Sequence, residues 1–193
     1  MENAESKFAS KNLTMGEMNA IVKKLGGEES ARKFLRDELI VSGQKIIQID
    51  RSQPFDPAKF IGAGWSIEEQ DEKSLALTEV DLTKVVFETT LEKKEKTIKG
   101  EDKINRLKEK NVTRLDAKIF QTLWENQNLI PEEWKKKTNG NTTFIFFDGT
   151  ILRFSLGRRC VLCLCWLGGE WYWFFYWLGG DFDVNFPSAV LAS

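Results

Sequence analysis

The chain of 193 residues contains no histidine, and this absence removes several kinds of chemistry at once. Histidine is the most frequent general base and metal ligand in proteins, so catalytic Ser-His and Cys-His arrangements are excluded. The formal net charge is only −1, which gives no support for a surface that binds nucleic acid. We therefore expect a protein that is not an enzyme, with no catalytic residues and no nucleic acid among its partners.

The sequence also lacks a secretory signal and a phosphate-binding loop. No apolar run follows a basic start, which predicts a cytoplasmic protein, with the cell surface as the alternative. The pair Gly62-x-Gly64 has neither the later glycine nor the lysine of a phosphate-binding loop. We expect no cofactor.

Cysteine is scarce and confined to one short stretch, Cys160-x-x-Cys163-x-Cys165. An odd number of closely spaced cysteines does not build a disulfide framework, which favours a reducing compartment. On a strand, Cys163 and Cys165 point to one face and Cys160 to the other, and there is no fourth cysteine to complete a metal site. We expect small apolar strand residues here and no bound metal.

The N-terminal region has the pattern of a helical hairpin. Thr14 and Glu17 have the spacing of a capping box, and apolar residues follow at helical intervals up to residue 25. Gly26-Gly27 ends this helix, and a second is expected over 28–39. We expect residues 1–45 to form a docking or oligomerisation module, because its acidic residues disfavour DNA binding.

Residues 46–58 contain Pro54 and Pro57 and are expected to be a linker to a domain over 59–193. In that domain two helices are expected, the second with Asp116 as its N-cap and Ile119, Phe120, Leu123 and Trp124 as its apolar stripe. The remaining patterns predict strands over 60–67, 75–87, 159–166 and 170–178, and a hairpin over 142–152 that turns at Asp148-Gly149. The order of elements predicts an α+β domain with a mainly antiparallel sheet.

The last 40 residues differ sharply from the rest of the chain. They hold four of the seven Trp, both Tyr and all three Cys, yet no Lys, Gln, Thr, Ile or Met. On one strand, Trp171 and Trp173 lie on one face and Tyr172 and Phe174 on the other. If one face is core, the other is an exposed apolar patch, which usually marks a binding site.

The composition of this tail can be examined through the codons that encode each residue type. Asn, Lys, Thr and Ile have codons that begin with adenine, and a process that replaces adenines would leave a shortage of these residues. A set of tail residues has types that codons ending in C or T can encode: Phe154, Leu156, Arg158, Cys163, Cys165, Leu167, Gly168, Tyr172, Phe174, Phe175, Tyr176, Gly179, Gly180, Phe182, Val184 and Phe186. Trp166, Glu170, Trp171, Trp173 and Trp177 cannot come from such codons and interleave with them as if fixed.

Residues 54–193 resemble the variable proteins of diversity-generating retroelements. The resemblance is carried by Phe60-Ile-Gly-Ala-Gly-Trp-Ser-Ile67, Phe147-Asp-Gly-Thr-Ile-Leu-Arg153 and Asn185-Phe-Pro-Ser-Ala-Val-Leu191, with 69–82 and 115–127. The group it most resembles comes from uncultivated, small-genome microbes. In this family, adenine positions of a template repeat are randomised during reverse transcription and written into the end of the target gene. The resemblance implies a C-type-lectin-like fold, with two helices on a twisted antiparallel sheet.

The resemblance also implies a recognition function. The adenine-depleted positions become candidate ligand contacts, and we expect the ligand to be a protein. Tyr172, Phe174, Tyr176 and Phe182 are the expected aromatic anchors, with Leu167, Arg158 and Phe186 at the margins. Trp166, Trp171, Trp173 and Trp177 are the expected buried framework. The calcium-dependent sugar motif of true C-type lectins is absent, so carbohydrate binding is not implied.

Three alternatives remain at this point. The aromatic segment 160–178 has the length of a spanning helix and could anchor the protein to a membrane, although Gly168-Gly169 and Glu170 oppose a span. The aromatic residues could simply fill the core of a β-rich domain. A related fold also occurs in formylglycine-generating enzymes, which use paired cysteines, so Cys163 and Cys165 keep an enzymatic alternative open.

Overall fold

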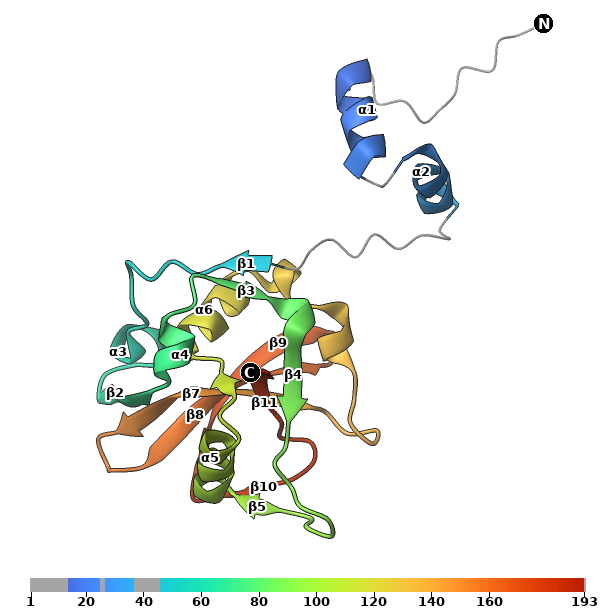
Figure 1. Ribbon diagram of the computed structural model, residues 1–193. Helices are drawn as coiled ribbons and strands as arrows, with labels where there is room; N and C mark the ends of the chain where they lie inside the picture. The colour runs from blue at the N-terminus through green and yellow to red at the C-terminus, as the bar shows by residue number, and fades with distance from the viewer. Residues whose placement is uncertain (1–13, 25–26, 37–45, 193) are drawn as a thin grey trace, which may run out of the picture. The chain divides into compact units, whose positions relative to one another are not determined.

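The computed structural model describes residues 14–24, 27–36 and 46–192 (Figure 1). It divides into two compact units, residues 1–43 and 44–193. The larger unit mixes helices with a mostly antiparallel sheet, which confirms the α+β class.

The smaller unit contains α1 (Met15–Lys24) and α2 (Glu28–Leu35). The capping box is confirmed: the Thr14 N–H donates to Glu17 Oε2 at 2.8 Å, and the Glu17 N–H donates to Thr14 Oγ1 at 3.3 Å. Gly27 has a φ of 104°, which suits glycine at a helix end. Residues 25, 26 and 37–39 of the expected helices lie outside the described residues. Met18, Ile21 and Leu35 are exposed, which leaves apolar side chains of this unit on its surface.

The main sheet of the larger unit is ordered β4-β11-β7-β8-β9. Its strands are β4 (Val85–Glu88), β11 (Ser188–Leu191), β7 (Phe144–Phe154), β8 (Arg159–Leu167) and β9 (Glu170–Trp177). All neighbours in this order are antiparallel except β11 and β7. β2 (Trp65–Gln70) pairs with the second half of β7, and β6 (Thr113–Arg114) pairs with β11.

Helices pack on both faces of this sheet (Figure 1). Helix α6 (Ala117–Glu125) begins after Asp116, whose carboxylate accepts from the N–H groups of Lys118 and Ile119 as expected of an N-cap. Its buried stripe packs with Leu162 and Leu164 of β8 in what we call the α6 core. Helix α5 (Gly100–Glu109) inserts Ile104 among Phe146, Val161 and Cys163 on the other face, the α5 core.

The remaining elements are short. They are α3 (Pro57–Phe60), α4 (Glu72–Leu75), β1 (Ile46–Gln48), β3 (Glu79–Asp81), β5 (Ile98–Lys99), β10 (Asp181–Phe182) and the 3₁₀ turns η1 (Leu82–Lys84), η2 (Gln127–Leu129) and η3 (Glu132–Lys135). β1 pairs with β3, and β5 pairs with β10. The expected strands over 60–67 and 75–87 are therefore only partly right. The first begins only at Trp65, and η1 divides the second into β3 and β4.

The expectation of a linker over 46–58 is wrong. Ile47, Ile49 and Phe55 are buried in the α6 core, and β1 pairs with β3. The two prolines do not separate domains. Pro57 occupies the first turn of α3, where its missing N–H costs nothing.

The expected hairpin over 142–152 is also wrong, because β7 runs through Asp148-Gly149 without turning. Gly149 is needed for a different reason. A Cβ at this position would lie 2.1 Å from the Arg114 carbonyl oxygen, so only glycine lets the chain before α6 cross so closely. The Gly149 N–H donates to the Leu115 carbonyl at 2.9 Å across this crossing.

Candidate functional site

The tail forms the β8–β9 hairpin that the sequence predicts. Gly168 and Gly169 have φ values of 62° and 95°, which are typical of a primed two-residue turn. Register is continuous from Leu167 opposite Glu170 to Cys160 opposite Trp177. Alternate residues of β9 therefore lie on opposite faces, so Trp171, Trp173, Phe175 and Trp177 face the α6 side and Tyr172, Phe174 and Tyr176 the α5 side.

The tryptophans near the turn belong to the α6 core. Trp171 is 5% exposed and lies 5.4 Å from the ring of Trp166, while the ring of Trp173 lies 5.0 Å from that of Phe60. Farther along β9 the core ends, and Phe175 and Trp177 are 47% and 51% exposed. The expectation that Trp177 is buried framework is wrong, because it shares the face of Trp171 but lies beyond the edge of the core.

The predicted anchors on the α5 side of the hairpin are also partly exposed and partly buried. Tyr172 and Phe174 are 41% and 45% exposed, as expected of anchors. Phe182 is only 1% exposed and packs 4.9 Å from the ring of Phe146, so the expectation that it is an exposed anchor is wrong. Tyr176 is half-buried against Phe182 and Phe186.

The three cysteines are free thiols and all are buried. Cys163 packs in the α5 core, whereas Cys160 lies on the other face of β8, which confirms the expected alternation. Burial raises the pKa of each thiol, most strongly that of Cys163, so the reactive thiolate is disfavoured. Cys163 and Cys165 were expected as contact positions. As buried side chains they cannot touch a ligand without a rearrangement.

An apolar groove of about 520 Å³ opens on the α6 side, beyond the end of the α6 core. Its lining residues are Trp65, Phe154, Arg158, Cys160, Phe175, Tyr176 and Trp177. The rings of Trp65 and Phe175 meet at 4.6 Å and those of Trp65 and Phe154 at 5.0 Å. The structure thus brings together predicted contact positions from the end of β7 (Phe154), the turn before β8 (Arg158) and the second half of β9 (Phe175).

Arg158 is the one charged residue in this lining. Its guanidinium carbon lies 5.7 Å from the centroid of the Trp177 ring, and no described carboxylate forms an ion pair with it. The neighbouring Arg153 and Arg159 differ, because both are held by Glu68. The groove therefore combines aromatic walls with an uncompensated positive charge at its rim.

The other predicted positions lie in several environments. Leu156, Leu167, Gly168 and Val184 are exposed, while Phe154, Phe186, Gly179 and Gly180 are partly buried. A Cβ at Gly179 would come within 2.2 Å of the Trp177 ring, so any side chain there must move that ring. Sequence reasoning missed Trp65, Cys160 and Trp177 as groove residues. The expected β8–β9 register places Cys160 on the same face as Phe175, so the sequence could have indicated Cys160. No local pattern in the sequence places Trp65 beside the tail.

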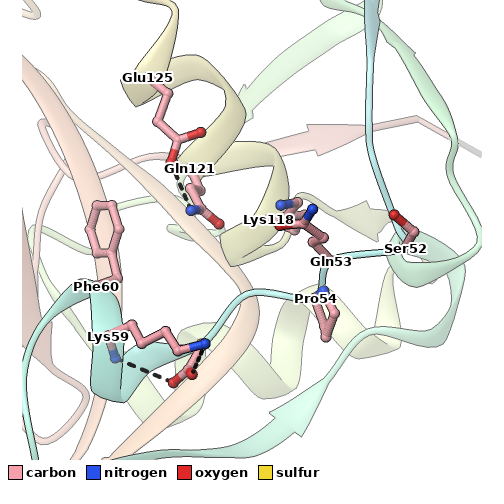
Figure 2. Close-up of a pocket in the computed structure, with 9 residues that line it drawn as sticks. Ser52, Gln53, Pro54, Lys59, Phe60, Lys118, Gln121 and Glu125 are labelled. Atoms are coloured by element: carbon pink, nitrogen blue, oxygen red, sulfur yellow. Dashed lines mark hydrogen bonds and ion pairs between the residues drawn. The ribbon is translucent and has the colours of Figure 1, made fainter.

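Two further hollows are polar and lie outside the tail. The larger, of about 550 Å³, is lined by residues that include Ser52, Lys59, Lys118 and Gln121 (Figure 2). Some of its polar groups already bond to one another, as Gln121 Nε2 does to Glu125 at 2.7 Å. The second, of about 360 Å³, contains the ion pair of Arg114 with Asp71 at 3.1 Å. In both hollows the polar and charged groups pair with one another more than in the aromatic groove, where Arg158 has no partner among the described carboxylates.

The segment 160–178, which the membrane alternative concerns, folds as β8 and β9. Within the described part of the chain, no helix has the length and apolar character needed to cross a membrane. The described residues also contain no group of three or more acidic or cysteine side chains placed to hold a metal ion. Comparison of the chain with protein-family models, with curated proteins and with solved structures gives no match.

Proposed function

We propose that this chain is a recognition protein that binds a polypeptide ligand through its C-terminal hairpin. The observation that carries the proposal is the aromatic groove, where the predicted contact positions Phe154, Arg158 and Phe175 converge. The role is that of a non-enzymatic variable protein of a diversity-generating retroelement, on a C-type-lectin-like fold. The two helices packed on a mostly antiparallel sheet and the β8–β9 hairpin that displays the predicted positions support this fold.

The physical basis for binding is the exposed aromatic surface. Large apolar side chains exposed together are uncommon on a soluble domain and usually mark an interaction site. Four rings of β9 are each more than 40% exposed, Tyr172 and Phe174 on the α5 side and Phe175 and Trp177 on the α6 side. Burying such a ring in a fitting pocket contributes about 2 kcal/mol or more to affinity. The buried Trp171 beside them holds the strand in place.

Diversification requires a framework that tolerates change at the displayed positions. Exposed residues such as Leu156, Leu167 and Tyr172 can change without opening a cavity, because they contribute little to either core. The buried positions Cys163, Cys165 and Phe182 tolerate only small apolar or shape-matched replacements. We infer that ligand specificity resides in the exposed subset.

A pair of display libraries tests this proposal. The first randomises Leu156, Arg158, Leu167, Tyr172, Phe174 and Phe175. The second randomises Asp102, Asn105 and Glu109, which are exposed on α5 and distant in sequence from the tail. Both are selected against one panel of unrelated purified proteins. We expect folded binders from the tail library and none from the α5 library. Equal yields from both, or unfolded variants throughout the tail library, would refute the proposal.

A further inference from the structure

The outer edge of β9 is free, and it runs beside the aromatic groove. β9 is the last strand of the sheet and pairs with β8 alone among the described strands. The Leu178 N–H donates to the Arg159 carbonyl at 2.9 Å, and bonds alternate along an antiparallel pair. The N–H and C=O groups of Trp171, Trp173 and Phe175 therefore point away from β8, where no described residue bonds to them.

The sequence and register of β9 lack the features that block pairing with another strand. Natural edge strands are protected by lysine, proline, bulges or a covering segment. β9 contains neither lysine nor proline, and its register with β8 has no bulge. Its single charged residue, Glu170, lies at its first position. The edge can therefore accept the backbone of an added strand.

The positive charge of Arg158, at the C-terminal end of β9, indicates which kind of polypeptide segment fits this edge. Arg158 lies over Trp177, the last residue of β9, and has no carboxylate partner among the described residues. A guanidinium beside apolar walls is best matched by a carboxylate that also carries an apolar group. The C-terminal residue of a polypeptide has this chemistry, and it brings the backbone that the free edge can bind.

We propose that the groove and the β9 edge bind the C-terminal end of a partner polypeptide. Arg158 binds the terminal carboxylate, the last side chain enters the groove and packs against the wall that Trp65 and Phe175 form, and the preceding backbone pairs with Trp173 and Phe175. Because Arg158 lies at the end of β9, the bound segment runs in the same direction as β9. This inference rests on the proposed recognition function and names the class of partner.

The test is a selection from a peptide library whose last six positions are random and whose carboxyl end is free. We expect the full chain to enrich peptides that end in Phe, Trp or Leu. An enriched peptide, synthesised with a carboxamide end, should bind roughly tenfold more weakly or worse, because a hydrogen-bonded charge pair is lost. No enrichment, or enriched peptides that bind equally well as amides, would overturn the proposal.

Two arginine variants test whether Arg158 causes the preference for a free carboxyl end. Arg158→Gln should weaken the free-acid peptide to the level of the amide and leave the amide unchanged. Arg153→Gln is the matched control, since Arg153 is exposed on the neighbouring strand but is held by Glu68, and it should preserve the difference. If Arg158→Gln retains the preference for the acid, the assignment to Arg158 is wrong.

A final comparison separates a polypeptide end from a free carboxylate. 2-Naphthoate offers the charge and an aromatic ring but no backbone for the edge, so it should displace the peptide only weakly. Displacement by 2-naphthoate at the peptide's own concentration would overturn the role of the edge. Binders from the tail library with no selection of carboxyl ends would refute this inference and leave the recognition function standing.

Discussion

The ring centroids of Trp65 and Phe175 lie 4.6 Å apart. This contact connects β2, which pairs with β7, to β9, the last strand of the main sheet. Trp65 belongs to the part of the chain with ordinary composition, and Phe175 belongs to the aromatic tail. Their contact forms one wall of the groove. A residue of the framework thus completes a site in which Phe154, Arg158 and Phe175 were predicted to vary.

The aromatic residues of β9 should separate into two sets by their effect on stability. Trp171→Ala should lower the free energy of unfolding by about 3–5 kcal/mol, because Trp171 is 5% exposed in the α6 core. Tyr172→Ser and Phe174→Ser should each change it by less than about 1 kcal/mol, because both side chains are more than 40% exposed. Chemical denaturation of the three variants measures this. Similar losses in all three would mean that the tail is simply core.

Gly149→Ala should destabilise the protein by roughly 3 kcal/mol, because its Cβ would meet the Arg114 carbonyl oxygen at 2.1 Å. Gly140→Ala is the control. Gly140 has a φ of 80° and open space around it, so only backbone strain of about 1 kcal/mol is expected. Thermal or denaturant unfolding compares the two. A smaller loss at Gly149 than at Gly140 would contradict the close crossing.

Lys103 and Asp148 form a pair buried in the protein, with Nζ 3.7 Å from Oδ2 and each side chain 1% exposed. Burial lowers the Lys103 pKa to about 8, although Asp148 opposes the shift. Lys103→Met leaves the carboxylate buried without its cation and should cost about 3–5 kcal/mol. Adding Asp148→Asn should recover roughly 1–2 kcal/mol, because the amide is neutral and still accepts from Ser188. No recovery in the double variant would contradict the pairing.

Stability at acidic pH should depend on Glu95. Hydrogen bonds from Arg106, at 2.5 and 2.8 Å, lower the Glu95 pKa from 4.5 to about 2. The folded-state pKa is depressed, so the stabilisation is fully present above pH 4.5 and is lost as the pH falls toward 2. The difference in unfolding free energy between wild type and Glu95→Gln should therefore shrink over this range. Arg106→Gln should behave in the same way, and a constant difference would contradict the assignment.

Features set by local chemistry could be predicted from the sequence. The Gly168-Gly169 turn needs positive φ at both positions, and the Asp116 cap needs only its own helix. Strand alternation likewise predicted that Trp171 and Tyr172 face opposite sides. These inferences depend on residues close together in the chain, so no knowledge of the tertiary fold was needed.

Features set by distant contacts could not be predicted. Asp148-Gly149 has the composition of a turn, but its glycine serves a crossing with residues before α6. The codon pattern predicted Phe182 and Cys163 as contact positions, but it carries no information on their burial. The exposure of Trp177 depends on where the α6 core ends. Trp65 joins the groove only because β2 pairs with β7.

We propose that the exposed tail positions were diversified by replacement of adenines in their codons. Sequencing the gene and the DNA beside it tests this proposal. We expect a nearby near-copy of the segment encoding residues 154–186, with differences confined to adenines of that copy and falling on codons such as those of Arg158, Tyr172 and Phe175. Differences scattered over all four bases, or concentrated in the codons of Trp171 and Trp173, would contradict it.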